Sequence, residues 1–424
     1  MKKSYRTLEF SFIQDYIKNY CFSEMAKKRI DQIQPFQDID DLKLYQDDIS
    51  SAMKIIYAYG RIPLAPYEDI KEILQKAQKG GVCYPQDLLK IVQILKNVQA
   101  YLDQEIEQSH LLEILSLLYL PKDLYNEILK CVDPSGNIYD HASHELYRLR
   151  RQISAIEANM RKKIEALRAQ NKDYLSHDVI STRNDHFVLP VNVSYKNQIK
   201  GIHHGHSSSG RTTYVEPEEI VSYNNQLSQI KQDEQLEIHR ILLELTKKVR
   251  SYDRVLNEDL EIMIEMDAVF AISEYGKKLD MVMPVVDENC QEIELLKARH
   301  PLIDQKEVVA NDIVLKKPQD ILLISGSNTG GKTVALKTAG LLSLMAIGLP
   351  IPVTQAKLPL FDDVFVDVGD EQSIEQSLST FSSHMKRLVF ITQHATKNSL
   401  VIIDEICSGT DPKEGESLAE AILT

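Results

Sequence analysis

A glycine-rich segment that ends in lysine and threonine offers the clearest chemistry in this sequence. Residues 326–333, Gly-Ser-Asn-Thr-Gly-Gly-Lys-Thr, match the phosphate-binding pattern G-x-x-x-x-G-K-[ST] in full. Glycines let backbone N–H groups turn toward phosphate oxygens, and a following helix adds the partial positive charge of its N-terminus. The pattern predicts that Lys332 reaches the β- and γ-phosphates of a nucleotide and that Thr333 ligates Mg²⁺. The phosphate-binding residues expected from the pattern are Gly326, Ser327, Asn328, Thr329, Gly330, Gly331, Lys332 and Thr333.

Two carboxylates at the end of an apolar run form the second candidate group. The run Leu-Val-Ile-Ile at 400–403 is followed directly by Asp404 and Glu405. Ligand groups in α/β folds gather at the carboxyl ends of parallel strands. We expect Asp404 to hold Mg²⁺ together with Thr333, and Glu405 to orient or deprotonate an attacking water. Alone, the pair fits a solvated strand end better; beside the complete phosphate loop, Glu405 and Lys332 are the predicted catalytic residues.

These residues need an α/β framework, and the last third of the chain has that pattern. Strand-like apolar runs occur at 313–315, 321–324, 364–367 and 400–403, with helical segments between them. The run at 321–324 is expected to be a buried strand that leads into the phosphate loop. We therefore predict an α/β domain over residues 280–424.

The rest of the chain reads as helical with one β-rich insert. Residues 1–135 predict a core domain of short helices separated by polar breaks. Residues 136–178 and 216–279 carry apolar side chains at spacings of three and four and predict two long helical arms. Residues 179–215 are rich in β-formers, glycine, serine and histidine, and predict a β-rich tip between the arms, which the family resemblance described below makes clamp-like.

Composition places the chain among folded, water-soluble proteins. It has 424 residues, of which 43% are hydrophobic, and a formal net charge of −13. This balance excludes a uniformly basic protein that wraps nucleic acid, but it permits local basic surfaces. The 5 scattered cysteines suit a reducing compartment, and neither a signal peptide nor a long apolar run is apparent. We expect a cytoplasmic protein with no membrane partner.

The order of these motifs resembles the nucleotide-binding domain of MutS-type ATPases, which are relatives of the ABC ATPases. The phosphate loop, Ser-Thr-Phe-Ser-Ser-His-Met at 379–385, the apolar run with Asp404 and Glu405, and Gly-Thr-Asp-Pro at 409–412 carry this resemblance. The segments 183–190 and 207–217 are similar to the bacterial MutS-two subfamily, and the resemblance runs nearly end to end. It implies an α-helical core and arms followed by a P-loop ATPase domain of ABC type, with ATP and Mg²⁺ as cofactors.

The resemblance also implies roles that spacing alone does not give. The Ser379–Thr380 segment would face the γ-phosphate of the opposite subunit in a homodimer. Asp411 would lie in the loop that crosses this interface, and the stretch with His300 and Pro301 would pack near the adenine. Two departures concern Ser327, where the family usually has proline, and Cys407-Ser408, which replaces a glycine and a small or basic residue. The helical run that reaches Thr424 lacks a capping residue, so we expect a C-terminally truncated chain.

Basic residues gather on the first arm despite the acidic total. The segment from Arg148 to Lys172 contains eight basic residues and two glutamates, which gives it a net charge of +6. Such clustering suits phosphate contacts, although a solvated helix face is the alternative. The basic residues expected to contact nucleic acid are Arg148, Arg150, Arg151, Arg161, Lys162, Lys163, Lys196, Lys200 and Arg211. His203, His204 and His206 have no neighbouring cysteine or carboxylate in the sequence, so no metal site is predicted there.

The combined interpretation is a Mg²⁺-dependent, dimeric ATPase that binds nucleic acid. The resemblance offers branched or recombining DNA as the substrate, with suppression of recombination as the role. The alternative is ATP-driven binding and rescue of stalled or collided ribosomes through ribosomal RNA. A third possibility is a truncated remnant that binds nucleotide without turnover. Mismatch recognition is disfavoured. Phe22-Ser-Glu24 matches the Phe-x-Glu pair of mismatch-reading MutS proteins, but so short a match is expected by chance.

Overall fold

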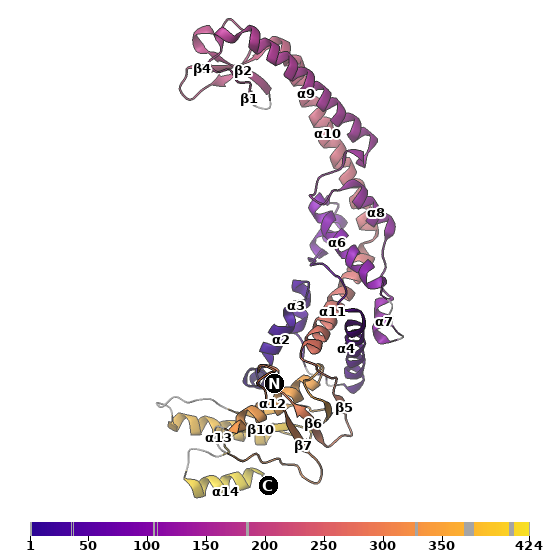
Figure 1. The fold of residues 1–424 in the computed structure, drawn as a ribbon, viewed down its shortest axis with the longest axis vertical. Coiled ribbons are helices and arrows are strands. Elements are labelled where there is room, and N and C mark those ends of the chain that lie inside the picture. Colours follow the sequence, from indigo (N-terminus) through magenta and orange to yellow (C-terminus); the bar gives the residue numbers. More distant parts are fainter. Residues whose placement is uncertain are drawn as a thin grey trace. The chain divides into compact units, whose positions relative to one another are not determined.

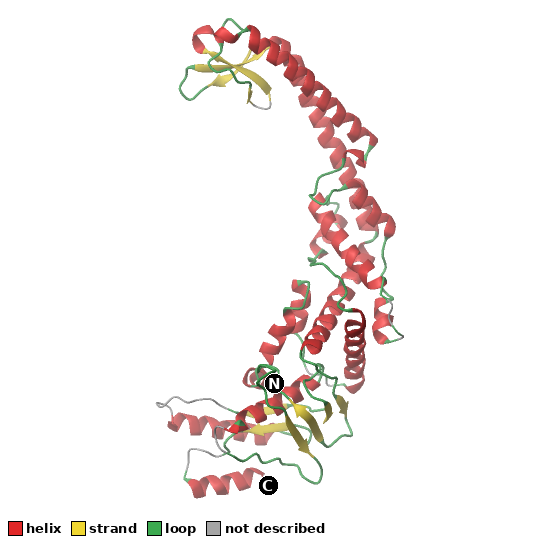
Figure 2. Ribbon diagram, viewed as in Figure 1, coloured by secondary structure: helices red, strands yellow, loops and turns green. Residues whose placement is uncertain are grey.

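The chain forms two compact units. A computed structural model describes residues 2–34, 36, 38–104, 107, 109–183, 186–326, 330–368, 377–406 and 411–423. The first unit, here called the P-loop unit, comprises Met1–Asp69, Lys96–Tyr119 and Asn257–Thr424, and the second, the arm unit, comprises Ile70–Leu95 and Leu120–Leu256. Figure 1 labels the elements, and Figure 2 shows that helices dominate and that strands are confined to small sheets. The domain boundaries proposed from the sequence remain predictions.

The arm unit is built on two long helices that pack side by side. α9 spans His144–Gln170 and α10 spans Glu218–Ser251. Ser143 caps α9, because its side chain accepts a hydrogen bond from the N–H of Leu146 at 3.0 Å. The buried seam of α9 consists of Leu146, Leu149, Ile153, Met160, Ile164 and Leu167, as the apolar spacing predicted. The remaining helices of the unit are α5 (Lys71–Gln78), the first part of α6 (Pro85–Leu102), α8 (Lys122–Cys131) and the 3₁₀ turns η1 (Asp140–Ala142), η2 (Lys172–Tyr174) and η3 (Val193–Tyr195).

Four short antiparallel strands form the tip sheet of the arm unit. They are β1 (Ser181–Arg183), β2 (His186–Asn192), β3 (Gly201–His206) and β4 (Thr212–Pro217), in the order β1-β2-β4-β3. Strands therefore occur where the sequence predicted a β-rich insert. Its apolar core joins Leu189, Val191 and Val215 of the sheet to residues of α9 and α10. A Cβ atom at Gly201 would lie 1.9 Å from the carbonyl oxygen of Glu216, so only glycine allows this approach of β3 to β4.

The N-terminal part of the P-loop unit is helical, and buried carboxylates stabilise it by accepting backbone hydrogen bonds. Its helices are α1 (Lys2–Thr7), α2 (Phe10–Lys18), α3 (Glu24–Asp31), α4 (Ile39–Tyr59), α7 (His110–Leu115) and most of α11 (Asp253–Lys278). Asp267 of α11 accepts hydrogen bonds from the backbone N–H groups of Phe22 and Ser23, which fixes the start of α3. Asp259, also on α11, accepts one from the N–H of Tyr119 at 3.0 Å. Burial raises the pKa of Asp259 to about 6 in spite of that hydrogen bond.

The second part of the P-loop unit contains two sheets and three helices. One sheet has the order β5-β8-β6-β7, and the other is the parallel pair β9 and β10. The bounds of the strands are β5 Val285–Asp287, β6 Ile293–Ala298, β7 Asn311–Leu315, β8 Gln355–Pro359, β9 Val364–Asp367 and β10 Leu400–Ile403. The helices are α12 (Lys332–Ala346), α13 (Ser377–His394) and α14 (Pro412–Leu423). α12 lies close against β10, since a Cβ atom at Gly340 would be 2.5 Å from Ile402.

Two expectations differ from the structure. The long helical arm predicted over residues 216–279 is divided at Tyr252 into α10 and α11. The run 321–324 forms no strand, and Ile321, Leu322 and Leu323 are 51%, 46% and 80% exposed. A central strand needs hydrogen-bond partners on its flanks, and none of the described strands pairs with this run. The strand predicted for this run and the burial predicted for it are therefore both wrong.

The helices that the structure describes include none that is both long and apolar enough to cross a membrane.

Candidate functional site

The phosphate loop joins α12 through glycines in backbone conformations that other residues rarely adopt. Gly326 has φ of 152° and Gly331, the N-cap of α12, has φ of 79°. The ammonium of Lys332 donates a hydrogen bond to the carbonyl oxygen of Gly326 at 2.8 Å. The ammonium of Lys332 therefore lies within the loop, and its predicted contact with the β- and γ-phosphates remains a prediction. Ser327, Asn328 and Thr329 lie outside the described residues.

The two predicted Mg²⁺ ligands meet in space. The hydroxyl of Thr333, in the first turn of α12, donates a hydrogen bond to Oδ2 of Asp404 at 2.7 Å, although 71 residues separate them in the chain. Two oxygens that ligate one Mg²⁺ at right angles lie about 2.9 Å apart, because each Mg–O bond is about 2.0–2.1 Å. The observed separation and the all-oxygen donor set fit this ion. Thr333 and Asp404 are thus a suitable pair to hold Mg²⁺.

Glu405 lies at the same strand end in a strained backbone conformation. Its φ of 48° is in the left-handed region, which is uncommon for a residue with a long side chain. Its side chain is exposed, whereas the neighbouring Asp404 is half-buried. Such strain costs about 1–3 kcal/mol and gathers at functional positions. The geometry leaves the carboxylate of Glu405 accessible to solvent water.

A buried carboxylate beside Asp404 escaped the sequence analysis. Asp367 is the last residue of β9, and Asp404 directly follows the neighbouring strand β10. The carbonyl oxygen of Asp367 accepts a hydrogen bond from the N–H of Asp404 at 2.9 Å. Its carboxylate, 1% exposed, contacts Nδ1 of His384 at 3.1 Å and accepts a hydrogen bond from Arg387 at 3.0 Å. This pair of contacts attaches α13 to the strand end. The available signal was the similar pattern of an apolar run ending in aspartate at 364–367.

α13 carries the segment expected to reach a second subunit. Ser379 and Thr380 lie near its N-terminus, on the helix that Asp367 anchors. Asp411 is exposed, and its carboxylate accepts a hydrogen bond from the N–H of Lys413 at 3.0 Å at the start of α14. Cys407, Ser408, Gly409 and Thr410 lie outside the described residues. The roles of Ser379, Thr380 and Asp411 remain predictions.

The stretch after β6 expected near the adenine is packed inside the P-loop unit. His300 is 6% exposed and Pro301 is buried. Burial lowers the pKa of His300, so its imidazole is neutral at physiological pH. Arg299 donates hydrogen bonds to the carbonyl oxygens of Leu279 and Asp280, which ties this stretch to the end of α11. A contact between His300 or Pro301 and adenine remains a prediction.

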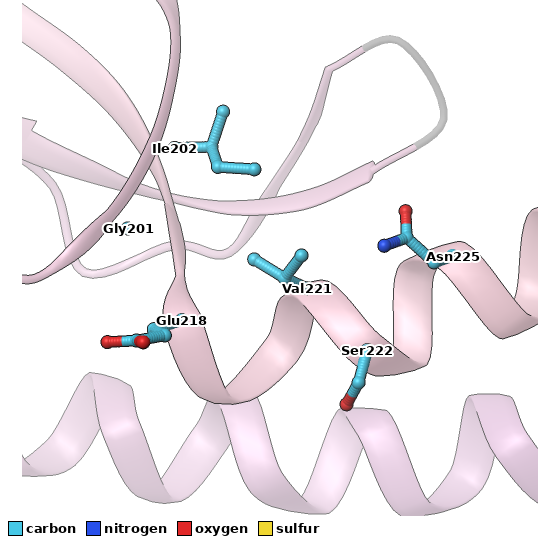
Figure 3. A pocket seen from close by; sticks show the side chains of 6 residues that line it. All are labelled: Gly201, Ile202, Glu218, Val221, Ser222 and Asn225. Atoms are coloured by element: carbon cyan, nitrogen blue, oxygen red, sulfur yellow. The ribbon is translucent and has the colours of Figure 1, made fainter.

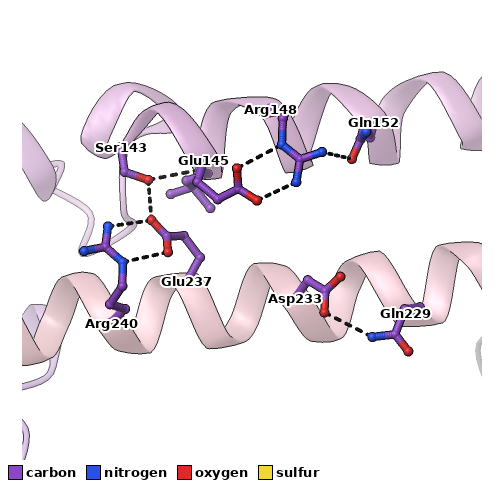
Figure 4. A network of polar contacts seen from close by, with 9 residues as sticks. Ser143, Glu145, Arg148, Gln152, Gln229, Asp233, Glu237 and Arg240 are labelled. Carbon is purple, nitrogen blue, oxygen red and sulfur yellow. Dashed lines mark hydrogen bonds and ion pairs between the residues drawn. The ribbon is translucent and has the colours of Figure 1, made fainter.

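The predicted nucleic-acid residues fall into two groups. Figure 4 shows Arg148 bound to Glu145 and Gln152 on its own helix. Arg150 is paired with Glu234 at 2.8 Å, and the guanidinium of Arg151 lies 5.7 Å from the ring centre of Tyr147. Arg148 and Arg151 are exposed as well, and the second group, here called the exposed group, consists of the exposed residues for which no side-chain contact is described: Arg161, Lys162, Lys163, Lys196, Lys200 and Arg211. Within the described part of the chain, no ion pair involves a member of this exposed group.

A shallow hollow between β3 and the start of α10 is unsuited to phosphate. Figure 3 shows its lining, and Glu218 is the charged side chain in it. A carboxylate repels an anionic ligand, so we assign no nucleotide or nucleic-acid contact to this hollow. The lining residues are Gly201, Ile202, Glu218, Val221, Ser222 and Asn225.

Comparison with known proteins agrees with the motif order. Residues 322–424 match the family MutS domain V. The chain is 38% identical over 430 residues to endonuclease MutS2 of Clostridium kluyveri, covering 100% of the chain and 55% of that protein. It is 39% identical to endonuclease MutS2 of a Geobacillus species, covering 98% of the chain and 54% of that protein, and 38% identical to that of Bacillus velezensis, covering 100% and 55%. The chain thus spans about half the length of these relatives. Over the part that it spans, the chain is therefore MutS2-like, and its residues 322–424 resemble domain V of the MutS family.

Proposed function

We propose that the P-loop unit binds Mg-ATP and hydrolyses it. The observation that carries this proposal is the 2.7 Å contact between Thr333 and Asp404, which joins the two halves of the predicted site. When bound, Mg²⁺ neutralises charge on the phosphate oxygens. Lys332 exchanges the carbonyl oxygen of Gly326 for an oxygen of the β- or γ-phosphate. Glu405 accepts a proton from the attacking water, which its exposed carboxylate can reach.

We further propose that a homodimer completes the site. The MutS-type resemblance assigns Ser379, Thr380 and Asp411 to the nucleotide of the opposite subunit. Their placement on α13 and at the start of α14 supports a shared surface, because Asp367 links α13 to the strand end that carries the Mg²⁺ ligand. Positioning groups from two subunits make turnover depend on dimer formation. A chain that binds ATP but never dimerises would be the binding-only remnant.

Substitution of Lys332 tests nucleotide binding. Lys332→Ala should weaken ATP binding by at least about tenfold, because a charge-assisted hydrogen bond to phosphate contributes about 1.5–3 kcal/mol. Lys357→Ala is the matched control, since Lys357 is an exposed residue of β8 with the same charge. Titration with a fluorescent ATP analogue measures both affinities. Equal affinities in the two variants would remove the phosphate loop from the proposed site.

Substitution of Glu405 separates hydrolysis from binding. Glu405→Gln keeps the shape of the side chain but removes the proton acceptor, so turnover should fall by about 10²–10⁴-fold while ATP affinity is retained. Single-turnover hydrolysis and nucleotide titration on the same preparation give the two quantities. If turnover stays at the wild-type rate, another residue activates the water.

We propose that the exposed basic residues of the arm unit contact nucleic acid. Replacing Arg161, Lys162 and Lys163 of α9 by glutamate should weaken binding and reduce its salt dependence, because fewer phosphate counterions are released. A variant with Lys122, Lys130 and Lys247 replaced by glutamate is the matched control, since these residues are exposed and the change in charge is identical. Binding to a DNA four-way junction and cosedimentation with ribosomes distinguish the two proposed partners. An equal loss in both variants would indicate a general charge effect instead of a binding surface.

A further inference from the structure

Two histidines and a glutamate meet at the tip sheet of the arm unit. Oε2 of Glu216 lies 2.8 Å from Nδ1 of His186 and 2.6 Å from Nε2 of His204. The potential ligand atoms of the three residues all lie within 4.8 Å of one another. His203, His204 and His206 have no carboxylate beside them in the sequence. The structure supplies one from the neighbouring strand.

The register of the sheet brings the three side chains to one face. β4 lies between β2 and β3, so Glu216 is flanked by both histidine-bearing strands. Ile202 is paired with Glu216, and His204 follows two residues later on the same strand. The pairing of Leu189 with Val215 puts Val188 opposite Glu216, and His186 is two residues from Val188. Diagonal neighbours at this offset are within reach of long side chains.

The surroundings of Glu216 favour a bound cation. Its side chain is 0% exposed, and burial of a carboxylate is costly unless a positive charge or several donors compensate it. Within the described part of the chain, its ion-pair partners are two imidazoles and include neither lysine nor arginine. Asn224 of α10 donates a hydrogen bond to the other oxygen, Oε1, at 2.8 Å, and so orients the carboxylate. A ligating carboxylate that is itself hydrogen-bonded is typical of metal sites.

We propose that His186, His204 and Glu216 bind one divalent transition-metal ion, Zn²⁺, with water as the fourth ligand. Two imidazoles and a carboxylate are a donor set that Zn²⁺ accepts in tetrahedral geometry. Ligand atoms around tetrahedral Zn²⁺ are about 3.3 Å apart, because the bonds are about 2.0–2.1 Å. Small rotations of the two imidazoles would open the observed contacts by about 0.5–0.7 Å to this spacing. The histidine side chains are 23% and 13% exposed, so the ion has access from solvent.

The ion would connect three strands that are otherwise held by short ladders. β3 pairs with β4 through a register shift between His203 and His206, which interrupts the ladder beside His204. A metal bridge from His204 to Glu216 acts across this interruption. Zn²⁺ is therefore expected to stabilise β3 in the arm unit and to slow its local opening.

Metal titration of the 424-residue chain, prepared without a polyhistidine tag, tests the proposal. Zn²⁺ competition with a chromophoric chelator should give one ion per chain, and Co²⁺ should give the intense visible absorption of a tetrahedral site. His204→Gln and His186→Gln should each weaken Zn²⁺ affinity by at least about tenfold and abolish that absorption. His206→Gln is the matched control, because His206 is an exposed histidine of the same strand that lies outside the cluster.

Hydrogen exchange provides a second readout that does not depend on metal affinity alone. Zn²⁺ should slow exchange of the β3 amides in the wild type and in His206→Gln, and should leave His204→Gln unchanged. Retained far-ultraviolet circular dichroism of the variants shows that they fold. The proposal is overturned if no stoichiometric ion binds, or if His186→Gln and His204→Gln bind Zn²⁺ as tightly as His206→Gln. The three residues would then form a hydrogen-bonded cluster only.

Discussion

The contact between Asp367 and Arg387 predicts an unequal response to loss of either partner. Arg387→Met leaves the carboxylate of Asp367 buried at 1% exposure with His384 beside it. Breaking a fully buried ion pair in this way costs about 3–5 kcal/mol. Because the Arg387 side chain is 26% exposed and water screens it, we expect about 2 kcal/mol. Asp367→Asn leaves the more exposed guanidinium behind, which turns to water, so we expect about 1 kcal/mol.

Native-state hydrogen exchange of α13 measures this effect locally. A loss of about 2 kcal/mol accelerates exchange through local opening by about 30-fold. Lys386→Met is the matched control, since Lys386 is the exposed neighbour on the same helix. The double variant should lose less than the sum of the two single variants, because each already removes the shared contact.

Three results would refute this reasoning. A larger loss for Asp367→Asn than for Arg387→Met would show that burial does not decide the cost. Additive losses would show that the two residues do not interact, and an equal loss for Lys386→Met would point to helix propensity. If the proposed dimer is correct, Arg387→Met should also lower ATP turnover, because it loosens the helix that carries Ser379 and Thr380.

Three further predictions follow from other buried or close contacts. Because burial raises the pKa of Asp259 to about 6, the folded chain holds this proton more tightly than the unfolded chain, and the stability from this group is full below about pH 4 and lost as pH rises through about 6. In Asp259→Asn, the free energy of unfolding measured in urea should vary with pH by about 1–2 kcal/mol less than in the wild type. An unchanged pH profile of the free energy of unfolding would contradict this prediction. Gly201→Ala should abolish exchange protection of β3, because its Cβ atom overlaps the carbonyl of Glu216, whereas Gly205→Ala, with open space at Cβ, should cost only about 1 kcal/mol through its positive φ. Mg²⁺ should raise the ATP affinity of the wild type but not that of Asp404→Asn, and the two proteins should have equal ATP affinities in EDTA. A full Mg²⁺ response in the variant would exclude Asp404 as a ligand.

Sequence patterns predicted best where local chemistry and helical spacing agree. The apolar seam of α9 follows from helical periodicity, and the strands β9 and β10 follow from short apolar runs. The break at Tyr252 was not predictable from the absence of glycine and proline, because packing can end a helix without either.

Contacts between distant residues escaped the analysis for a different reason. Asp367 and Arg387 are 20 residues apart, and Glu216 and His186 are 30 apart, so no local pattern joins them. The pairing of strands decides which polar side chains share a face, and that register depends on turns and bulges along several segments. The same limit applies to 321–324, because its apolar composition favours a strand but no described strand lies beside it to supply the pairing.

The exposed run 321–324 has a thermodynamic consequence for ligand affinity. The phosphate loop is flanked on one side by α12, which is packed against β10, and on the other by a run that has no strand partner among the described residues. Fixing an unpaired residue costs about 1–2 kcal/mol in conformational entropy, and a nucleotide that orders this run must supply that free energy from its own contacts. If the proposed nucleotide orders this run, strand pairing at 321–324 and nucleotide binding are linked, and each raises the equilibrium constant of the other by the same factor. Under the proposed function, a strand added beside Leu322 would then increase nucleotide affinity without touching the nucleotide.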